Sequence, residues 1–264
     1  MYFRSQMEVI KTISLIGAGN VGVNLGKSLK KAGYTFNSVY SRRLDKARKL
    51  AVDLDARPTN DLHSIEQSDM VLLAIPDTAI VWVAERLSHK HPFLVHVSGS
   101  TSLDTIRPYA SQSGVLYPLQ TFSVFKEIDF SDIPLCIEGS SENTTEQLKT
   151  LASDITHDVR EVNSGQRLSI HLAAVFSSNF VNYLNIEATD ILEKAGVSRD
   201  ILFPLMRETL NKLLEYKPKD AQTGPAVRKD HGTMAKHIEV LNLHPDKQKI
   251  YRILSEQIQR TFED

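Results

Sequence analysis

Short apolar runs and longer amphipathic segments alternate through the first 162 residues. The run Met70 to Ile75 is apolar throughout, which is typical of a strand buried on both faces of a sheet. Apolar residues then recur at helical spacing in Ile80 to Leu87. The same alternation predicts further strands at 13–16, 39–40, 93–97, 115–117, 135–137 and 159–162, and further helices at 20–31, 44–54 and 146–155. Strands that alternate with helices predict an α/β fold of the doubly wound Rossmann class, with a mainly parallel sheet.

The pattern changes after about Val162, where strand-like runs stop and helical periodicity continues to the end. The segment Leu168 to Leu184 is apolar on nearly all sides, which predicts a buried central helix. Amphipathic segments follow, and one of them places four apolar residues on a single helical face, namely Leu202, Met206, Leu210 and Leu213. We therefore predict two domains, an α/β domain over residues 1–162 and an all-helical domain over residues 163–264.

Composition and charge narrow the class of protein. The chain carries 31 Lys and Arg residues against 32 Asp and Glu residues, and the two kinds are interspersed, so we expect neither nucleic acid nor a membrane as a partner. No apolar run reaches the roughly 20 residues that a membrane helix needs, and the first residues lack the apolar core of a signal peptide. The single cysteine, Cys136, lies in an apolar run and cannot form an internal disulfide. These features predict a cytoplasmic protein with a buried, inert thiol.

A glycine motif follows the first predicted strand. Residues 17–22 read Gly17-Ala18-Gly19-Asn20-Val21-Gly22, which matches the G-x-G-x-x-G pattern of dinucleotide-binding turns. In that pattern the first glycine permits the tight turn, the second lets the backbone approach a pyrophosphate, and the third lets helix and strand pack closely. The N-terminus of the next helix offers free N–H groups to the phosphates. Because the motif lies between a strand and a helix, we interpret it as a cofactor site and not as a structural turn alone.

The end of the second predicted strand indicates which nicotinamide cofactor binds. NAD sites usually place an Asp or Glu there, about 20 residues beyond the glycines, whereas this chain has Ser41-Arg42-Arg43. A serine hydroxyl and a guanidinium can bind the 2′-phosphate of NADP, and no carboxylate is present to repel it. Surface arginines without a ligand are the alternative. We predict NADP as the cofactor.

Two further loops follow strands at the edge where open α/β sheets bind ligands. The first contains Ala74-Ile75-Pro76, whose proline can fix the backbone along the cofactor ribose. The second contains Ser98-Gly99-Ser100, in which Gly99 permits a close approach of the cofactor. Ser98 and Ser100 are candidate substrate-binding residues, and for each serine a turn or a helix cap is the alternative.

Four segments together resemble a known family. They are 97–100, 117–122, 171–174 with Ser178-Asn179, and 223–226 with Arg228 and Asp230. With the glycine motif and residues 74–77, they resemble a family of bacterial Rossmann-like NADP oxidoreductases whose helical second domain has no assigned function. That family is related to pyrroline-5-carboxylate reductase, ketopantoate reductase, β-hydroxyacid dehydrogenases and deazaflavin-dependent NADP reductase. The resemblance spans nearly the whole chain. It implies NADP as the cofactor, a helical domain of the 6-phosphogluconate-dehydrogenase-like type and a homodimer formed through the C-terminal helices, but no particular substrate.

One departure from the related enzymes concerns catalysis. Ketopantoate reductases and β-hydroxyacid dehydrogenases have a lysine on the central helix as proton donor, with an asparagine one turn later. The corresponding helix of this chain has His171, then Val175 one turn later and Asn179 two turns later. The missing lysine argues against simple hydroxyacid chemistry.

Polar residues of the central helix form the candidate catalytic group. His171, Ser178, Asn179 and Asn182 are spaced so that they fall on one broad helical face. A histidine can donate a proton as hydride reaches the substrate, because imidazole titrates near physiological pH. We expect Asn179 to orient a carbonyl or carboxylate and Ser178 to contact the substrate. A hydrogen-bonded core histidine, with asparagines bonded to nearby backbone, is the alternative that the sequence leaves open.

A second polar group lies at residues 223–230. Thr223 and Arg228 are candidate substrate ligands, since an arginine can bind a carboxylate through two hydrogen bonds. A turn with an Arg–Asp ion pair, and with Asp230 as the N-cap of the next helix, is the alternative. The histidines show no zinc-binding spacing, so we expect no metal.

Three hypotheses follow. The first is an NADP(H)-dependent oxidoreductase that transfers a hydride to or from a small carbonyl or imine substrate, with the helical domain completing the site. The second, which the missing lysine motivates, is a protein that binds NADP as a sensor without catalysis. The third is hydride exchange between NADP and a deazaflavin.

Overall fold

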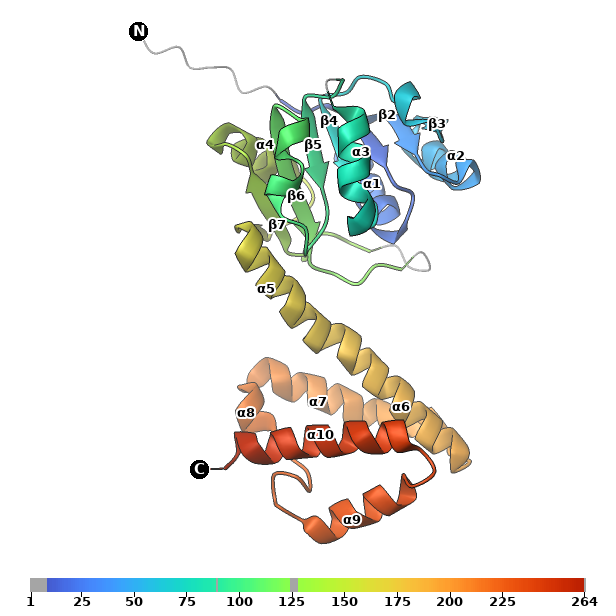
Figure 1. Cartoon of the computed structure of the whole chain (residues 1–264), viewed down its shortest axis with the longest axis vertical. Coiled ribbons are helices and arrows are strands. Elements are labelled where there is room, and N and C mark those ends of the chain that lie inside the picture. Colours follow the sequence, from blue (N-terminus) through green and yellow to red (C-terminus); the bar gives the residue numbers. More distant parts are fainter. Residues whose placement is uncertain (1–8, 89, 124–127, 264) are drawn as a thin grey trace. The chain divides into compact units, whose positions relative to one another are not determined.

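The chain has two compact units in its computed structural model, which describes residues 9–88, 90–123 and 128–263. The units divide between Asn179 and Phe180, and each has its own architecture (Figure 1). The first unit contains a sheet with helices on both faces, and the second contains helices alone in its described part. The predicted fold class is therefore confirmed.

One sheet organises the first unit. Its described residues form eight strands in the order β3-β2-β1-β4-β5-β6-β7-β8. All neighbours are parallel except β6 and β7. The strand order switches direction between β1 and β4, and open α/β sheets bind ligands at such a point. The strands are β1 (Thr12–Ile16), β2 (Thr35–Tyr40), β3 (Arg57–Thr59), β4 (Met70–Leu73), β5 (Phe93–His96), β6 (Gln112–Pro118), β7 (Leu135–Gly139) and β8 (Val159–Glu161).

Helices cover both faces of this sheet. One face packs against α1 (Asn20–Lys31), α2 (Leu44–Leu54) and α4 (Glu142–Ser153), and the other against α3 (Asp77–Leu87). Successive residues of a strand point to opposite faces, so Met70 and Leu72 join the first core while Val71 and Leu73 join the second. All four side chains are fully buried. This confirms the burial on both faces that the apolar run predicted.

The edge strand β3 is absent from the predicted elements. It has only three residues, of which Arg57 is exposed and Thr59 is buried. Pro58 is its one apolar residue. Such a short segment shows no alternation from which a strand can be predicted. It forms because β2 offers a free edge that Arg57–Thr59 pairs with in parallel.

The central helical stretch differs from the predicted helix in two respects. It consists of α5 (Ser164–Ala174), a π-helical segment (Val175–Phe180) and α6 (Val181–Lys194), and the π turn shifts the phase of the side chains that follow it. The prediction that it is buried is wrong for the single chain, because Leu172 and Phe176 are 56% and 63% exposed. The helices of the second half begin at Ser164, next to the predicted domain border. The compact units divide later, after Asn179. Helix α5 belongs to the sheet unit, since its residues Arg167 and His171 form hydrogen bonds with residues of the strands.

The second unit is helical. The side chain of Asp230 accepts a hydrogen bond from the backbone N–H of Thr233 (3.0 Å), which confirms it as an N-cap.

Ion pairs connect two helices of the second unit: Lys247 of α10 (Pro245–Thr261) binds Glu187 and Asp190 of α6. Buried residues in its described part number three, Ala226, Leu241 and Ser255. Besides α6, its helices are α7 (Phe203–Glu215), α8 (Pro218–Ala221), α9 (His231–Val240) and α10 (Pro245–Thr261).

No helix in the described ranges is both long enough and apolar enough to cross a membrane. The predicted burial of Cys136 is confirmed, and this burial raises the pKa of its thiol.

Candidate functional site

The three glycines of the turn between β1 and α1 have different surroundings. Gly17 has a φ of +116°, and a Cβ there would lie 2.1 Å from the carbonyl oxygen of Ala74. A Cβ on Gly22 would lie 2.2 Å from the carbonyl oxygen of Gly17. A Cβ on Gly19 would meet no atom within 4 Å. Two of the glycines therefore permit the turn and its packing, while Gly19 faces open space.

The N-terminus of α1 suits an anion. Gly19 is the N-cap residue, no side-chain hydrogen bond caps this end among the described residues, and the first turn contains no acidic residue. Backbone N–H groups of a first helical turn carry partial positive charge. The side-chain amide of Asn20 donates to the carbonyl oxygen of Phe122 (2.9 Å), so it holds the loop after β6 beside this turn.

A cavity of about 510 Å³, here called the glycine-turn cavity, joins three segments that are far apart in the sequence. They follow β1, β2 and β4, and they meet because the carboxyl ends of these parallel strands share one edge of the sheet. The lining includes three cations and no carboxylate. The predicted residues that line it are Gly17, Ala18, Gly19, Ser41, Arg42, Arg43, Ala74, Ile75 and Pro76, and Lys46, Tyr40, Thr78 and Trp82 lie among the others.

The two arginines of this cavity are not equivalent. The guanidinium of Arg43 binds the carboxylate of Asp45 through two hydrogen bonds, with Nη2 at 2.7 Å from Oδ2 and Nε at 3.2 Å from Oδ1. The hydrogen bond from Arg43 lowers the pKa of Asp45. Arg42 has no side-chain hydrogen bond or ion pair within the described part of the chain. Arg42 is therefore the guanidinium that is available to a phosphate.

A second cavity, of about 700 Å³, borders the same turn and is here called the histidine cavity. Val21 at the start of α1 and Val97 after β5 lie on one side of it. Residues 117–122 and the face of α5 and the π-helical segment complete it. The predicted residues His171, Ser178 and Asn179 all line this cavity. The structure thus brings the candidate catalytic group next to the N-terminus of α1.

Tyr117 also lines this cavity, although no function was predicted for it. Its hydroxyl lies 3.1 Å from Nδ1 of His171, and the two rings meet edge to face with centroids 5.9 Å apart. Tyr117 lies near the carboxyl end of β6, which is parallel to β5. The sequence offers one signal for Tyr117: it is a polar aromatic residue at the end of a strand that reaches the ligand-binding edge of the sheet.

Gly99 lies against this pair of rings. A Cβ at Gly99 would lie 2.8 Å from Cγ and from Nδ1 of His171, and 2.9 Å from Cε2 of Tyr117. In the structure, Gly99 therefore permits the close approach of the His171 and Tyr117 side chains. Its contact with a cofactor stays a prediction.

The hydroxyls of Ser98 and Ser100 both have hydrogen-bond partners within the chain. Ser98 Oγ accepts from the backbone N–H groups of Ser100 (3.1 Å) and Thr101 (2.9 Å), and it donates to Oγ1 of Thr101 (3.0 Å). Ser100 Oγ donates to the carboxylate of Asp77. Neither serine lines the glycine-turn cavity or the histidine cavity. The structure shows the alternative of a hydrogen-bonded turn, and substrate binding by these serines stays a prediction.

A buried arginine fixes the start of α5, and the sequence analysis did not single it out. Arg167 has a side chain only 1% exposed, and its Nη1 donates to the carboxylate of Glu138 on β7. Its Nη2 donates to the carbonyl oxygen of Thr101. Ser164 and the capping box of Asn163 and Gln166 hold the same helix end. Since His171 follows Arg167 by one turn of α5, this anchor positions the histidine.

Thr223 and Arg228 belong to the second unit, and both are exposed there. Thr223 offers its carbonyl oxygen to the side chain of Gln222 (3.1 Å). Substrate binding by Thr223 and Arg228 stays a prediction.

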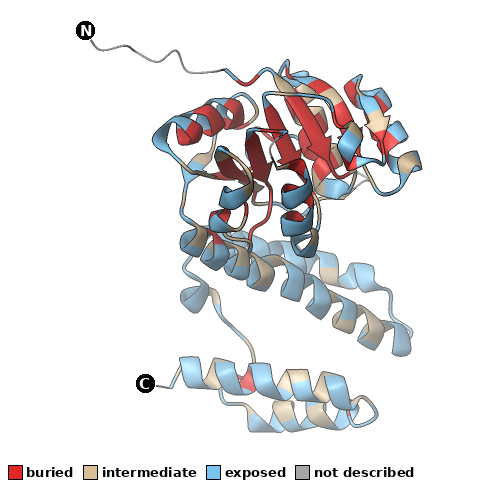
Figure 2. Cartoon of the chain, turned by 45° about the horizontal axis from the view of Figure 1, so that its top comes forward, coloured by how far each residue is buried: buried red, intermediate tan, exposed pale blue. Residues whose placement is uncertain are grey.

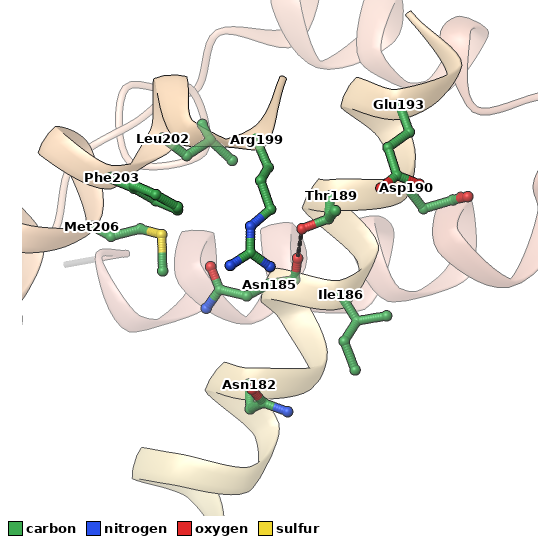
Figure 3. Close-up of a pocket in the computed structure, with 10 residues that line it drawn as sticks. All are labelled: Asn182, Asn185, Ile186, Thr189, Asp190, Glu193, Arg199, Leu202, Phe203 and Met206. Carbon is green, nitrogen blue, oxygen red and sulfur yellow. Dashed lines mark hydrogen bonds between the residues drawn. The ribbon is translucent and has the colours of Figure 1, made fainter. Parts of the chain in front are cut away.

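A third cavity, of about 390 Å³, lies within the second unit, and Figure 3 shows the residues that line it. Asn182 lines this cavity and not the histidine cavity, because the π turn changes the face on which it emerges. Arg199 extends toward Asn185, and its guanidinium lies 5.5 Å from the ring centroid of Phe203 (Figure 3). The structure therefore does not bring Asn182 together with His171 in one cavity. Among the described residues, no group of three or more His, Cys, Asp or Glu side chains is arranged to hold a metal ion.

Known families match both parts of the chain. Residues 12–99 match the family described as NADP oxidoreductase, coenzyme F420-dependent, and residues 133–258 match a domain of unknown function, DUF2520. No curated protein matches the chain.

Solved structures extend these matches over nearly the full length. A candidate NADP oxidoreductase from Bacteroides fragilis is 36% identical, with a TM-score of 0.90 over 97% of this chain and 100% of that one. An imine reductase from Myxococcus stipitatus in complex with NADP⁺ is 17% identical, with a TM-score of 0.65 over 95% of this chain and 92% of that one. A 1-pyrroline-5-carboxylate reductase from Streptococcus pyogenes is 15% identical, with a TM-score of 0.62 over 94% of this chain and 98% of that one. The latter two show a shared fold.

Proposed function

This chain belongs to the NADP oxidoreductase family of the Bacteroides fragilis protein, and we propose that it transfers a hydride between NADP(H) and a small imine or carbonyl substrate. One observation carries the proposal: the glycine-turn cavity and the histidine cavity both border the N-terminus of α1, where Gly19 lines one and Val21 the other. Arg42 would hold the phosphorylated ribose of a dinucleotide bound at this turn, and His171 would lie on the side of the nicotinamide.

The residues present fit NADP. Gly19 leaves open space beside the uncapped N-terminus of α1, which suits a pyrophosphate. Ser41, Arg42 and Lys46 offer a hydroxyl and two positive charges for a 2′-phosphate, and no carboxylate lines the cavity to repel it. The backbone from Ala74 to Pro76 lines the same cavity and would border the ribose. When bound, the cofactor supplies the hydride.

The histidine cavity supplies the remaining chemistry. His171 donates a proton to the nitrogen or oxygen of the substrate, while Asn179 and Ser178 orient it. We favour an imine, because the proton-donor lysine of hydroxyacid enzymes is missing and because two proteins of the same fold are an imine reductase and a reductase of a cyclic imine.

A homodimer through the C-terminal helices is part of this proposal. The second unit has almost no buried apolar residue within its described part, and large apolar side chains of α7 such as Leu210 and Leu213 are exposed. A surface of this kind marks a site of association. Sedimentation that shows only a monomer at working concentration contradicts this part.

Hydride exchange with a deazaflavin is a second candidate. The description of the family that matches residues 12–99 names a coenzyme of this kind, and it is the observation that favours this candidate. Reduction of a deazaflavin by NADPH in the presence of the chain, without turnover of any imine or carbonyl, supports it over the first proposal.

A fluorescence titration with NADPH and with NADH tests the proposed function. We expect tighter binding of NADPH. Since a hydrogen bond to a charged group contributes about 1.5–3 kcal/mol, Arg42→Ala should weaken NADPH binding by about 10- to 100-fold. Binding of NADH should stay unchanged. Arg48→Ala, on the exposed surface of α2, is the matched control.

The outcomes separate the hypotheses. Absence of binding to either nucleotide contradicts the proposal. Tight binding of NADPH without turnover of an imine, a carbonyl or a deazaflavin supports the non-catalytic sensor instead.

A further inference from the structure

We propose that Tyr117 is a positioning residue that holds His171 in one tautomer, with the ring proton on Nε2. The inference rests on the proposed function, because it assigns the Nε2–H group as the proton donor to the substrate. It also assigns Gly99 as the residue that lets the two rings meet.

The contact between the two side chains is direct. The hydroxyl oxygen of Tyr117 lies 3.1 Å from Nδ1 of His171, and the planes of the rings are 79° apart. Tyr117 is held on β6 by its pairing with Cys136 of β7. His171 is fixed by α5, which Arg167 anchors to Glu138 and to the carbonyl oxygen of Thr101.

We assign the phenol as the donor of this hydrogen bond, because His171 then carries its ring proton on Nε2, the nitrogen that is left for the substrate. Burial raises the pKa of Tyr117 above its usual value of 10.0, so its hydroxyl keeps its proton at physiological pH. Cys136 adds to this rise and the charge of Arg167 opposes it. A neutral imidazole that accepts at Nδ1 carries its proton on Nε2. Within the described part of the chain, Nε2 has no hydrogen-bond partner, and the histidine lines the cavity.

Glycine at position 99 is a requirement of this pair. A Cβ there would lie under 3 Å from atoms of both rings. With a larger residue at position 99, at least one of the two rings has to shift, and we expect the shift to disturb their hydrogen bond. The turn that carries Gly99 is itself held by the Ser98 hydroxyl, which accepts from Ser100 and Thr101.

The proton then moves in a balanced step. A hydride from the reduced cofactor forms the new C–H bond of the substrate, and the Nε2 proton of His171 forms the new N–H or O–H bond. As the Nε2–H bond breaks, Nδ1 takes the hydroxyl proton of Tyr117, so the imidazole stays neutral. The phenolate that remains is far less basic than the substrate anion it replaces, and water returns its proton.

Nitrogen-15 NMR of the histidine rings in the full-length protein tests the proposal without any substrate. We expect Nε2 of His171 to be the protonated nitrogen in the parent chain, with the resonance assigned by its loss in His171→Gln. In Tyr117→Phe both ring resonances should move toward the average of the two tautomers. The control Tyr109→Phe, at a partly buried tyrosine with no side-chain hydrogen bond in the described residues, should leave them unchanged. A proton on Nδ1 in the parent chain, or unchanged resonances in Tyr117→Phe, overturns the inference.

A second variant keeps both side chains and removes only their approach. Gly99→Ala should shift the His171 resonances in the same direction as Tyr117→Phe. Circular dichroism reports whether the variant is folded. A folded Gly99→Ala protein with the parent tautomer overturns the role of Gly99.

Turnover separates this inference from the proposed function. If the parent chain reduces an imine with NADPH, Tyr117→Phe should lower kcat by about 100-fold and leave the Kd for NADPH unchanged. Full activity in Tyr117→Phe overturns the inference alone. Binding of NADPH without turnover in the parent chain overturns the proposed function, while the NMR result still decides whether Tyr117 positions His171.

Discussion

Apolar helix faces have opposite environments in the two units of this chain. In the sheet unit the leucines of α1 and α4 that face the strands, such as Leu25 and Leu148, are fully buried. In the helical unit Leu210 and Leu213 of α7 are 57% and 46% exposed. Figure 2 shows the same contrast, with buried residues concentrated in and around the sheet. A periodic apolar face thus predicts a helix equally well in both units. The face is buried only where another part of the same chain packs against it.

The largest expected effect comes from a buried charge in the sheet unit, compared with an exposed charge of the same unit. Arg167→Ala leaves the carboxylate of Glu138 and the carbonyl of Thr101 without their partner, and breaking a buried ion pair lowers the free energy of unfolding by about 3–5 kcal/mol. The control is Arg160→Ala, which removes an exposed pair with Asp158 and should change stability little. Chemical denaturation measures both. Equal effects would contradict the anchoring role of Arg167.

Leucine truncation compares the two units directly. Leu72→Ala opens a cavity in the closed core of the sheet unit and should lower the free energy of unfolding by about 2–5 kcal/mol at any protein concentration. Leu210→Ala should have an effect that grows with protein concentration, because its side chain is exposed in the single chain and buried only in the proposed dimer. Denaturation at two protein concentrations tests this. A concentration-independent effect of Leu210→Ala would argue against the dimer.

Acid should weaken the sheet unit through His96. Burial, together with the charge of Arg167, lowers the pKa of this residue to about 4. At a pH between the pKa of about 6.5 in the unfolded chain and the pKa of about 4 in the folded chain, His96 binds a proton in the unfolded chain but not in the folded one. The free energy of unfolding should therefore be highest above pH 6.5, fall by about 3 kcal/mol as the pH drops to 4, and then level off. Denaturation curves across this range, in the parent chain and in His96→Gln, measure the effect. An equally steep fall in the variant would assign it to another group.

The smallest effect is expected in the helical unit. Hydrogen bonds from Lys194 and Lys247 lower the pKa of Asp190 to about 2. A carboxyl group with a lowered pKa in the folded chain stabilises the fold at any pH above its pKa in the unfolded chain, which is about 3.9. This stability is lost as the pH falls toward 2. Asp190→Asn should lower the melting temperature slightly at low salt and not at high salt, since the group is exposed. Asp200→Asn, at an exposed aspartate without an ion pair in the described residues, is the control. Equal losses at both salt concentrations would contradict an electrostatic cause.

Much of the candidate cofactor site is predictable from the sequence, because each part of it is local. Gly17 to Gly22, Ser41 to Arg43 and Ala74 to Pro76 each directly follow a strand. The rule that carboxyl ends of parallel strands share one edge is enough to bring them together, and the structure shows them around one cavity. The sequence did not distinguish Arg42 from Arg43, because the ion pair with Asp45 depends on side-chain geometry at the start of α2.

The candidate catalytic group is only partly predictable. His171, Ser178 and Asn179 follow from helical spacing, and they share a cavity. Asn182 does not join them, because the π-helical segment interrupts a periodicity that the sequence analysis assumed to be uniform. Ser98 and Ser100 follow a strand as expected, but the Ser98 hydroxyl is bonded within its own turn and the Ser100 hydroxyl to Asp77 of α3.

The Rossmann class, the change to helices near Ser164 and the position of the dinucleotide turn could all be predicted from the chain alone, since they depend on short-range periodicity and on what glycine permits. The meeting of Tyr117 with His171, 54 residues later, and the place of Gly99 against both rings became evident only in the folded chain. The same holds for the apolar helices of the second unit, which stay exposed in the single chain. Local sequence sets the local conformation of a residue, whereas its partners and its burial depend on which distant surfaces the fold brings against it.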